Sequence, residues 1–247
     1  RLQWAGRKSR FVTFHDHPLD PTTIAFALTH NMQIVHDACI IGGAPMGRDA
    51  ARVQELALAI AHESHTFFTA LRHHSLPSDV ADRLLRVCGL PRLNYLSRVG
   101  LLGEYSRALT FFDNEVTAAA IFIANPDPAT PHRLDQLSPP LRHGGLAFRS
   151  YRDHVAPFAS WGCFAQAAPH LQRLFSEGLP SAFSASLTNT LALIHPRVPP
   201  DVAETHLPPP TADSAECLAF YNADLSLAEK LQRRLTRATE DATRGSA

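Results

Sequence analysis

Hydrophobic residues recur at steps of three and four over most of the chain. The first such stripe contains Val53, Leu56, Ile60, Phe67, Phe68 and Leu71. It predicts one face of a long amphipathic helix that begins near position 48. Later stripes predict helices over 78–88, 93–99 and 109–123, and again from position 151 onward. We therefore expect a mostly α-helical protein whose helices form a bundle.

Short β-branched or aromatic runs precede the first of these helices. FVTF at 11–14 and QIVHDACII at 33–41 are bounded by Pro or Gly and predict strands. Next comes IIGGAPMG at 40–47, where we expect a tight turn that ends the extended segment and leads into the helix. The residues assigned to this turn are Gly42, Gly43, Pro45 and Gly47. Gly144 and Gly145 mark a second ordered loop, at 138–150.

Proline-rich sequence divides the C-terminal part of the chain. The stretch HPRVPPDVAETHLPPP predicts an extended, semi-rigid linker. An amphipathic, highly charged helix is expected after it. We therefore predict four segments, a β element at 1–47, a helical region at 48–194, a linker at 195–213 and a C-terminal helix at 214–247.

Composition places the chain among globular proteins. Of its 247 residues, 45% are hydrophobic and 19% are charged. No apolar run reaches the ~18 residues of a membrane span, so none is expected. The cysteines lie far apart without C-x-x-C spacing, which favours a reducing intracellular compartment. The chain begins RLQWAGRKSR, without Met, and we expect it to be part of a longer protein.

Two motifs suggest a ligand, and both are incomplete. IIGGAPMGRD has Arg48 and Asp49 where a Walker A loop has Lys and Ser or Thr, so we expect no nucleotide there. His62 and His65 share a helix face, but no third ligand is placed by spacing, so we expect no metal site. The sequence contains no recognisable arrangement of nucleophile and base or of paired carboxylates.

Arginine is the unusual feature of the charge. All but two of the 23 basic residues are arginines, and the lysines are Lys8 and Lys230. Between positions 83 and 107, five arginines accompany one acidic residue, and Tyr95 lies among them. This pattern is typical of a surface that contacts phosphates, with an aromatic ring available for stacking. The alternative is a solvated helix face.

The order of several motifs resembles the region after the polymerase palm in reverse transcriptases of non-LTR retrotransposons. The matching stretches are IIGGAPMG, LPSDVADRLLRVCGLPRLNYLSR, FFDNEV and LSPPLRHGGLAFRS, in the family's order. They cover about residues 33–165, and RKSR at 7–10 resembles the lysine-bearing end of the palm. The chain departs from the family at VGLLG (99–103), where two prolines are common, and at Ala147 and Phe148, which replace the second half of GLGL.

The resemblance implies a helical thumb and connection region that binds a template–primer duplex, with a remnant of the palm edge at 1–47. The nucleic-acid-binding residues that it implies are Lys8, Arg83, Arg86, Arg92, Tyr95, Arg98, Arg142 and Arg149. Polymerisation needs metal-binding aspartates, including an adjacent pair, and the sequence contains no Asp-Asp. We therefore expect no catalysis by this chain alone and no cofactor within it, a divalent metal being expected only with the missing palm.

Partners and location follow from the same resemblance. The expected partners are an RNA or DNA template–primer duplex and the missing palm and fingers of the same polyprotein, and the expected location is the nucleus. The alternative is a helical protein–protein interaction module without nucleic-acid binding, in which the final amphipathic helix docks on a partner.

Overall fold

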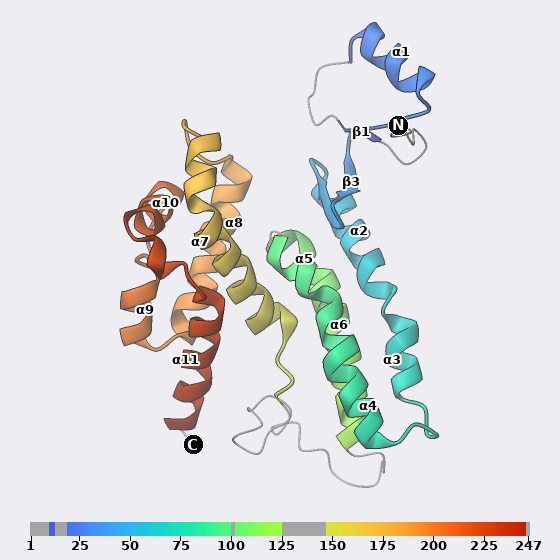
Figure 1. Cartoon of the computed structure of the whole chain (residues 1–247), viewed down its shortest axis with the longest axis vertical. Helices are drawn as coiled ribbons and strands as arrows, with labels where there is room; N and C mark the ends of the chain where they lie inside the picture. The colour runs from blue at the N-terminus through green and yellow to red at the C-terminus, as the bar shows by residue number, and fades with distance from the viewer. Residues whose placement is uncertain (1–9, 13–18, 100–101, 125–146, 246–247) are drawn as a thin grey trace, which may run out of the picture.

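The computed structural model describes residues 10–12, 19–99, 102–124 and 147–245. It confirms a mostly α-helical fold with a small β element near the N-terminus. Figure 1 shows two groups of helices side by side, an N-lobe built from residues 50–124 and a C-lobe built from residues 156–245. Within the described ranges, no helix has the length and apolar character needed to cross a membrane.

The β element consists of two separate strand pairs. Strand β1 (Arg10–Val12) pairs in parallel with β2 (Gln33–Val35), and helix α1 (Pro21–Thr29) connects them. Strands β3 (Ala38–Ile41) and β4 (Ala44–Gly47) form an antiparallel hairpin. The hydrophobic pattern of the sequence therefore predicted neither β4 nor the break between β2 and β3.

Glycine conformation explains the hairpin. Gly42 and Gly43 have φ values of +57° and +89°, a backbone conformation that residues with a side chain rarely adopt. The favoured two-residue hairpin turn requires positive φ values. The predicted turn residues therefore divide, because Pro45 and Gly47 lie on β4. At Gly47 a Cβ atom would lie 2.2 Å from the backbone oxygen of Asp37, so the chain approaches too closely there for any other residue.

The predicted long helix is divided in two. Helix α2 (Ala50–His62) is preceded by Asp49, the N-cap residue. The Asp49 carboxylate accepts hydrogen bonds from the backbone N–H groups of Ala51 and Arg52 at 2.9 and 3.1 Å. Helix α3 (His65–Leu71) follows after Glu63 and Ser64. Asp49 thus acts as a helix cap.

A continuous helical path covers residues 78–99, although its geometry changes along the way. It comprises α4 (Ser78–Leu84), a π-helical turn η2 (Leu85–Gly89), a 3₁₀ turn η3 (Leu90–Leu93) and α5 (Asn94–Val99). The sequence predicts a break between helices over 78–88 and 93–99, where Gly89 and Pro91 lie. In the structure they lie where the winding of the backbone changes, because Pro91 falls in the first turn of η3 and removes no hydrogen bond there.

Helix α6 (Leu102–Ala124) is the centre of the N-lobe. It packs along α2 and contributes Leu109, Phe112, Val116 and Ala120 to the core. The Phe112 ring meets Phe68 and Tyr151 edge-on, with centroids 5.3 and 4.9 Å apart. Tyr151 belongs to a π-helical turn, η6 (Tyr151–Val155), so the N-lobe core includes residues that lie beyond α6 in the sequence.

The C-lobe surrounds helix α7 (Ala156–Leu174). Its other elements are α8 (Ser181–Ile194), η7 (His195–Arg197), α9 (Pro200–His206), α10 (Ser214–Ala223), η8 (Leu225–Leu227) and α11 (Leu231–Gly245). Buried Trp161 donates a hydrogen bond from Nε1 to the Tyr221 hydroxyl at 2.7 Å, and that hydroxyl donates to the backbone oxygen of His206 at 3.0 Å. These bonds satisfy the polar groups that the aromatic core buries.

Residues 195–213 differ from the predicted linker. The segment contains η7 and α9, and Val198, Leu207 and Ala212 are buried in the same core as Trp161. Pro200 is the first residue of α9, where its fixed φ favours a helix start. Pro196 and Pro200 thus lie at helix starts, and the segment is part of the C-lobe.

The C-terminal helix is also part of this core. Leu231 and Leu235 of α11 are fully buried, and a Cβ atom on Gly162 would lie 3.1 Å from Cβ of Gln232, which shows how closely α7 and α11 approach. The apolar stripe that the alternative function assigned to a protein partner therefore contacts the chain itself.

Candidate nucleic-acid interface

The arginines of the 78–99 path differ in their exposure and in the side chains that they contact. Arg83 is exposed at the end of α4. Arg86 is half-buried, and its Nε donates to the Asp82 carboxylate at 2.8 Å while its guanidinium lies 4.6 Å from the centre of the Phe148 ring. Arg86 is therefore neutralised within the chain, whereas Arg83 faces solvent.

Arg92 and Tyr95 lie near the N-terminal β hairpin and α3. The Arg92 guanidinium stacks on Phe67 at 4.3 Å, and its Nε donates to the backbone oxygen of Cys88 at 3.2 Å, yet the residue remains exposed. Tyr95 is 50% exposed, and its ring lies close enough to Gly42 and Gly43 to contact a Cβ atom added there. The structure thus brings two of the predicted site motifs together.

Arg98 lies between the lobes. It is exposed on α5, and with Cys163 and Phe183 it lines a pocket of about 190 Å³ between α5, α7 and α8. Burial raises the pKa of the Cys163 thiol, and the nearby Arg98 charge acts in the opposite direction. Arg98 therefore faces a different part of the molecule from Arg92.

Arg149 forms an ion pair with Glu240 of α11, and both side chains are largely covered. This contact ties the segment before η6 to the final helix, so Arg149 is engaged within the chain. The remaining predicted site residues, Lys8, Arg142, Gly144 and Gly145, lie outside the described residues.

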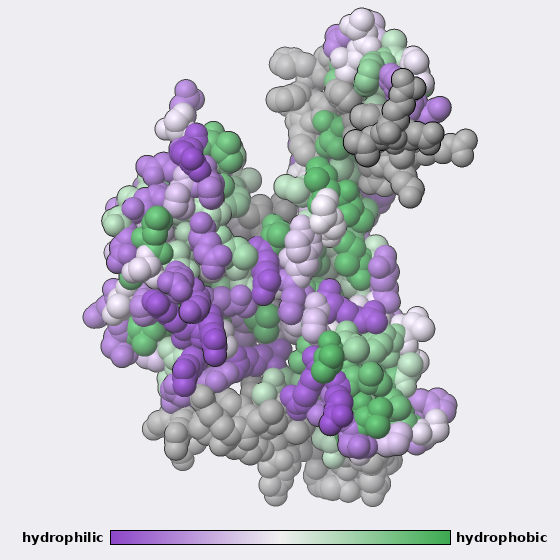
Figure 2. Space-filling model, viewed as in Figure 1, coloured by the Kyte–Doolittle hydropathy of each residue, from purple (hydrophilic) through white to green (hydrophobic). Residues whose placement is uncertain are grey.

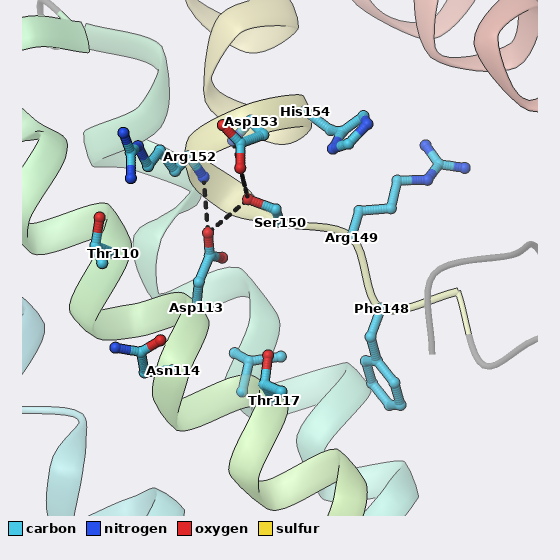
Figure 3. Close-up of a pocket in the computed structure, with 11 residues that line it drawn as sticks. Thr110, Asp113, Asn114, Thr117, Phe148, Arg149, Ser150, Arg152, Asp153 and His154 are labelled. Carbon is cyan, nitrogen blue, oxygen red and sulfur yellow. Dashed lines mark hydrogen bonds between the residues drawn. The ribbon is translucent and has the colours of Figure 1, made fainter. Parts of the chain in front are cut away.

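Asp113 has a role that the sequence analysis missed. Its carboxylate, on α6, accepts hydrogen bonds from the Ser150 hydroxyl at 2.6 Å and from the backbone N–H groups of Tyr151 and Arg152 at 2.5 and 3.1 Å. Figure 3 shows Asp113 directed at the start of η6, with the Arg149 and Arg152 side chains extending in opposite directions. Burial raises the pKa of Asp113, and the three donors oppose that effect.

Three pockets adjoin one another beside η6 and between the N-lobe and the C-lobe. One of about 360 Å³ lies beside Asp113, Arg152 and Asp153, and one of about 430 Å³ lies between α6 and α8. The first two share Arg152 and Asp153, and the second shares Ser186 and Thr190 with the pocket beside Arg98. We call these three adjoining pockets the interlobe groove.

Small and polar side chains on two helices line the interlobe groove. On α6 they are Gly103, Ser106, Thr110, Asn114 and Thr117, and on α8 they are Ala182, Ala185, Ser186, Asn189 and Thr190. Both sets recur at steps of three and four, so each forms one stripe along its helix. The spacing was visible in the sequence, although it could not show that Gly103 and Ser106 of α6 share a pocket with the α8 stripe.

The histidines considered as metal ligands have other contacts. The His62 ring packs on Phe111 with centroids 4.0 Å apart, and His65 Nδ1 lies 3.2 Å from the Glu115 carboxylate, which also accepts from Arg72 at 3.2 Å. Across the ranges that the structure describes, no three His, Cys, Asp or Glu side chains are grouped so that they could hold a metal ion.

Comparisons of the chain with protein-family models, with curated proteins and with solved structures gave no match. The resemblance to non-LTR reverse transcriptases therefore rests on the sequence motifs, and what it implies is a proposal.

Proposed function

We propose that this chain is the thumb and connection region of a retroelement reverse transcriptase, and that it holds a template–primer duplex without catalysing polymerisation. The observation that carries the proposal is the 78–99 path, which keeps Arg83, Arg92 and Arg98 exposed and packs Tyr95 against the Gly42–Gly43 turn. In the family that the motifs resemble, the corresponding turn and helices hold the primer and its duplex.

Charge supports binding to a phosphate backbone. Guanidinium groups pair with phosphate through two parallel hydrogen bonds, and each contact releases condensed counterions. Stacking on Phe67 fixes the Arg92 guanidinium before any ligand arrives, which lowers the entropy lost on binding. Arg86 and Arg149 are paired with carboxylates, so we assign the duplex contacts to Arg83 and Arg92 first.

Catalysis is assigned to partners. A two-metal polymerase site needs adjacent aspartates, and because this sequence lacks an Asp-Asp pair, we propose that the palm and fingers of the same polyprotein supply the aspartates and the divalent metal. By the same resemblance, we propose a nuclear location.

The test is a salt titration of duplex binding. Replacing Arg83 and Arg92 together by Ala is expected to weaken binding of the full chain to an RNA–DNA duplex about tenfold at low salt. It is also expected to lower the slope of log K against log salt by about two, because each lost phosphate contact contributes about 0.9. Fluorescence anisotropy with a labelled duplex measures both quantities.

The matched control replaces two exposed arginines of α11, Arg233 and Arg237, by Ala. It keeps the net charge of the test variant and should bind duplex as the parent does. Equal losses in the two variants, or no loss in an Arg83/Arg92 variant whose thermal unfolding is unchanged, would remove the duplex assignment.

A specific observation favours the alternative of a protein-interaction module. Large apolar side chains are exposed on α1 and on the hairpin, at Ile24, Phe26, Leu28, Ile40, Ile41 and Met46. Figure 2 shows hydrophobic residues gathered over β3 and α2 on the face that it displays. Exposed apolar side chains gathered in this way are typical of a protein contact. Such docking would depend little on salt, whereas duplex binding weakens steeply as salt rises.

A further inference from the structure

The interlobe groove is not explained by duplex binding. The stripes on α6 and α8 present small and polar residues with Leu109, Val116 and Leu193 beside them, whereas both helices bury their other faces in apolar cores. No hydrogen bond within the described ranges engages the Asn114 or Asn189 side chain. Those amides, together with the serine hydroxyls, are therefore available to a ligand that carries many acceptors.

Two arginines give the interlobe groove its charge. Arg98 borders one end, and Arg152 lies where the other two pockets meet. Within the described ranges, neither guanidinium contacts a carboxylate. Of the two carboxylates nearby, Asp153 pairs with Arg197 at 3.7 Å, whereas Asp113 accepts hydrogen bonds only from neutral donors and so offsets one of the two arginine charges. The unneutralised charge is thus positive and favours an anionic ligand.

Size restricts the form of that ligand. The three pockets have volumes of about 190, 360 and 430 Å³, and sites for single small ligands are on the order of 300–1,000 Å³. The two larger pockets can each take a mononucleotide-sized unit and the pocket beside Arg98 takes a smaller group, such as one base or one phosphate, whereas a double helix is too wide to enter. Because the pockets share lining residues, one extended chain can run through all three.

An aromatic ring lies beside one of the cations. Phe183 of α8 is half-buried and lines the pocket that also contains Arg98. A basic groove with an aromatic surface for a base is the arrangement that binds single strands without sequence preference. An acidic peptide would use the arginines, but its carboxylate side chains offer no ring to stack on Phe183.

We propose that the interlobe groove binds single-stranded nucleic acid, with Arg98 and Arg152 contacting its phosphates and the stripes on α6 and α8 lining its path. The proposal does not depend on the thumb assignment, since it rests on residues that face the C-lobe and not on Arg83 or Arg92.

The experiment measures binding of labelled single-stranded oligo(dT) to the full chain by fluorescence anisotropy. The Arg98→Ala, Arg152→Ala double variant is expected to bind about tenfold more weakly at low salt and to show a salt slope lower by about 1.4, because each phosphate contact with a single strand contributes about 0.7. The Arg83→Ala, Arg92→Ala variant is the matched control and should bind the oligonucleotide as the parent does.

A second variant tests the path sterically. A Cβ atom added at Gly103 meets no atom within 4 Å, so Gly103→Trp projects into the α6–α8 pocket without displacing the backbone. It should weaken single-strand binding at least fivefold, and Gly103→Ala should leave it unchanged. Duplex binding should be the same for both.

Three results would overturn the proposal. The first is unchanged oligonucleotide binding in both groove variants when their thermal unfolding is native. The second is an equal loss of oligonucleotide binding in the Arg83/Arg92 control. The third is displacement of oligo(dT) by poly-glutamate at equal charge concentration. The last result would assign the interlobe groove to an acidic peptide. Failure of the duplex test alone, with groove binding intact, would leave this proposal standing.

Discussion

Asp113 and Ser150 show how a residue's function depends on a distant part of the chain. They are 37 positions apart, and each lies in one of the motifs that resemble the reverse transcriptase family, FFDNEV and LAFRS. As a pair they cap η6, because the carboxylate takes the N–H groups that the first turn leaves without partners. Helical spacing showed Asp113 only as a polar residue on an apolar helix, so its partner could not be predicted.

Replacing Asp113 by Ala is expected to destabilise the chain by about 2 kcal/mol, because a helix cap is lost and half-buried N–H groups lose their acceptor. Urea unfolding followed by circular dichroism measures the change. The neighbouring Asn114 is exposed, and Asn114→Ala should change stability by less than about 0.5 kcal/mol. A small effect of Asp113→Ala would show that water replaces the carboxylate.

The arginines also show the limit of a single-residue prediction. Charge density along the sequence identified the 83–98 segment, but it did not distinguish Arg86, which pairs with Asp82, from Arg83, which does not. That distinction depends on which side chains lie one helical turn away and on where Phe148 packs. The sequence thus indicated a region only, and in the structure Arg83 and Arg92 lie exposed while Arg98 lines the interlobe groove.

At the scale of elements, the periodic apolar stripes predicted the helices well and the connections poorly. Helix α6 was predicted over 109–123 and extends over Leu102–Ala124, because its buried positions recur regularly. The 195–213 segment was predicted as a linker from its prolines. Its apolar residues are too few and too widely spaced for a periodic signal, yet Val198, Leu207 and Ala212 are buried in the same core as residues of α7 and α10.

Leu207 provides the test of this segment. It is 2% exposed, so Leu207→Ala should lower the free energy of unfolding by about 2–4 kcal/mol through the cavity that it leaves. Leu225 is 59% exposed, and Leu225→Ala should have little effect. If both variants unfold like the parent, the segment contributes nothing to the C-lobe core and the original linker prediction is restored.

At the scale of the whole molecule, one helical stretch belongs to both lobes. Residues 151–174 run continuously through η6 and α7, and Tyr151 and Ala156 are buried in the N-lobe core while Phe158 and Trp161 are buried in the C-lobe core. Because the backbone hydrogen bonds of a helix form cooperatively, unfolding of one core destabilises the shared helix and therefore the other core.

We therefore expect the two lobes to unfold in one transition. Trp161 reports on the C-lobe alone once Trp4 is replaced by Phe, since these are the two tryptophans of the chain. Its fluorescence and the far-ultraviolet circular dichroism of all helices should give coincident denaturation curves. Two separated midpoints would mean that the lobes are independent domains.

The shared helix also determines where the chain can be divided for expression. A fragment that ends at Ala124 contains every helix of the N-lobe but lacks Phe148, Tyr151 and Ala156, so the Phe112 ring loses an edge-on partner and the core stays open to water. The smallest N-terminal fragment with a closed core extends at least to Ala156. A C-terminal fragment that begins at Ala156 lacks η6 altogether, so its first helix starts without the turn that Asp113 caps, and residues 150–156 therefore contribute to both halves of the molecule.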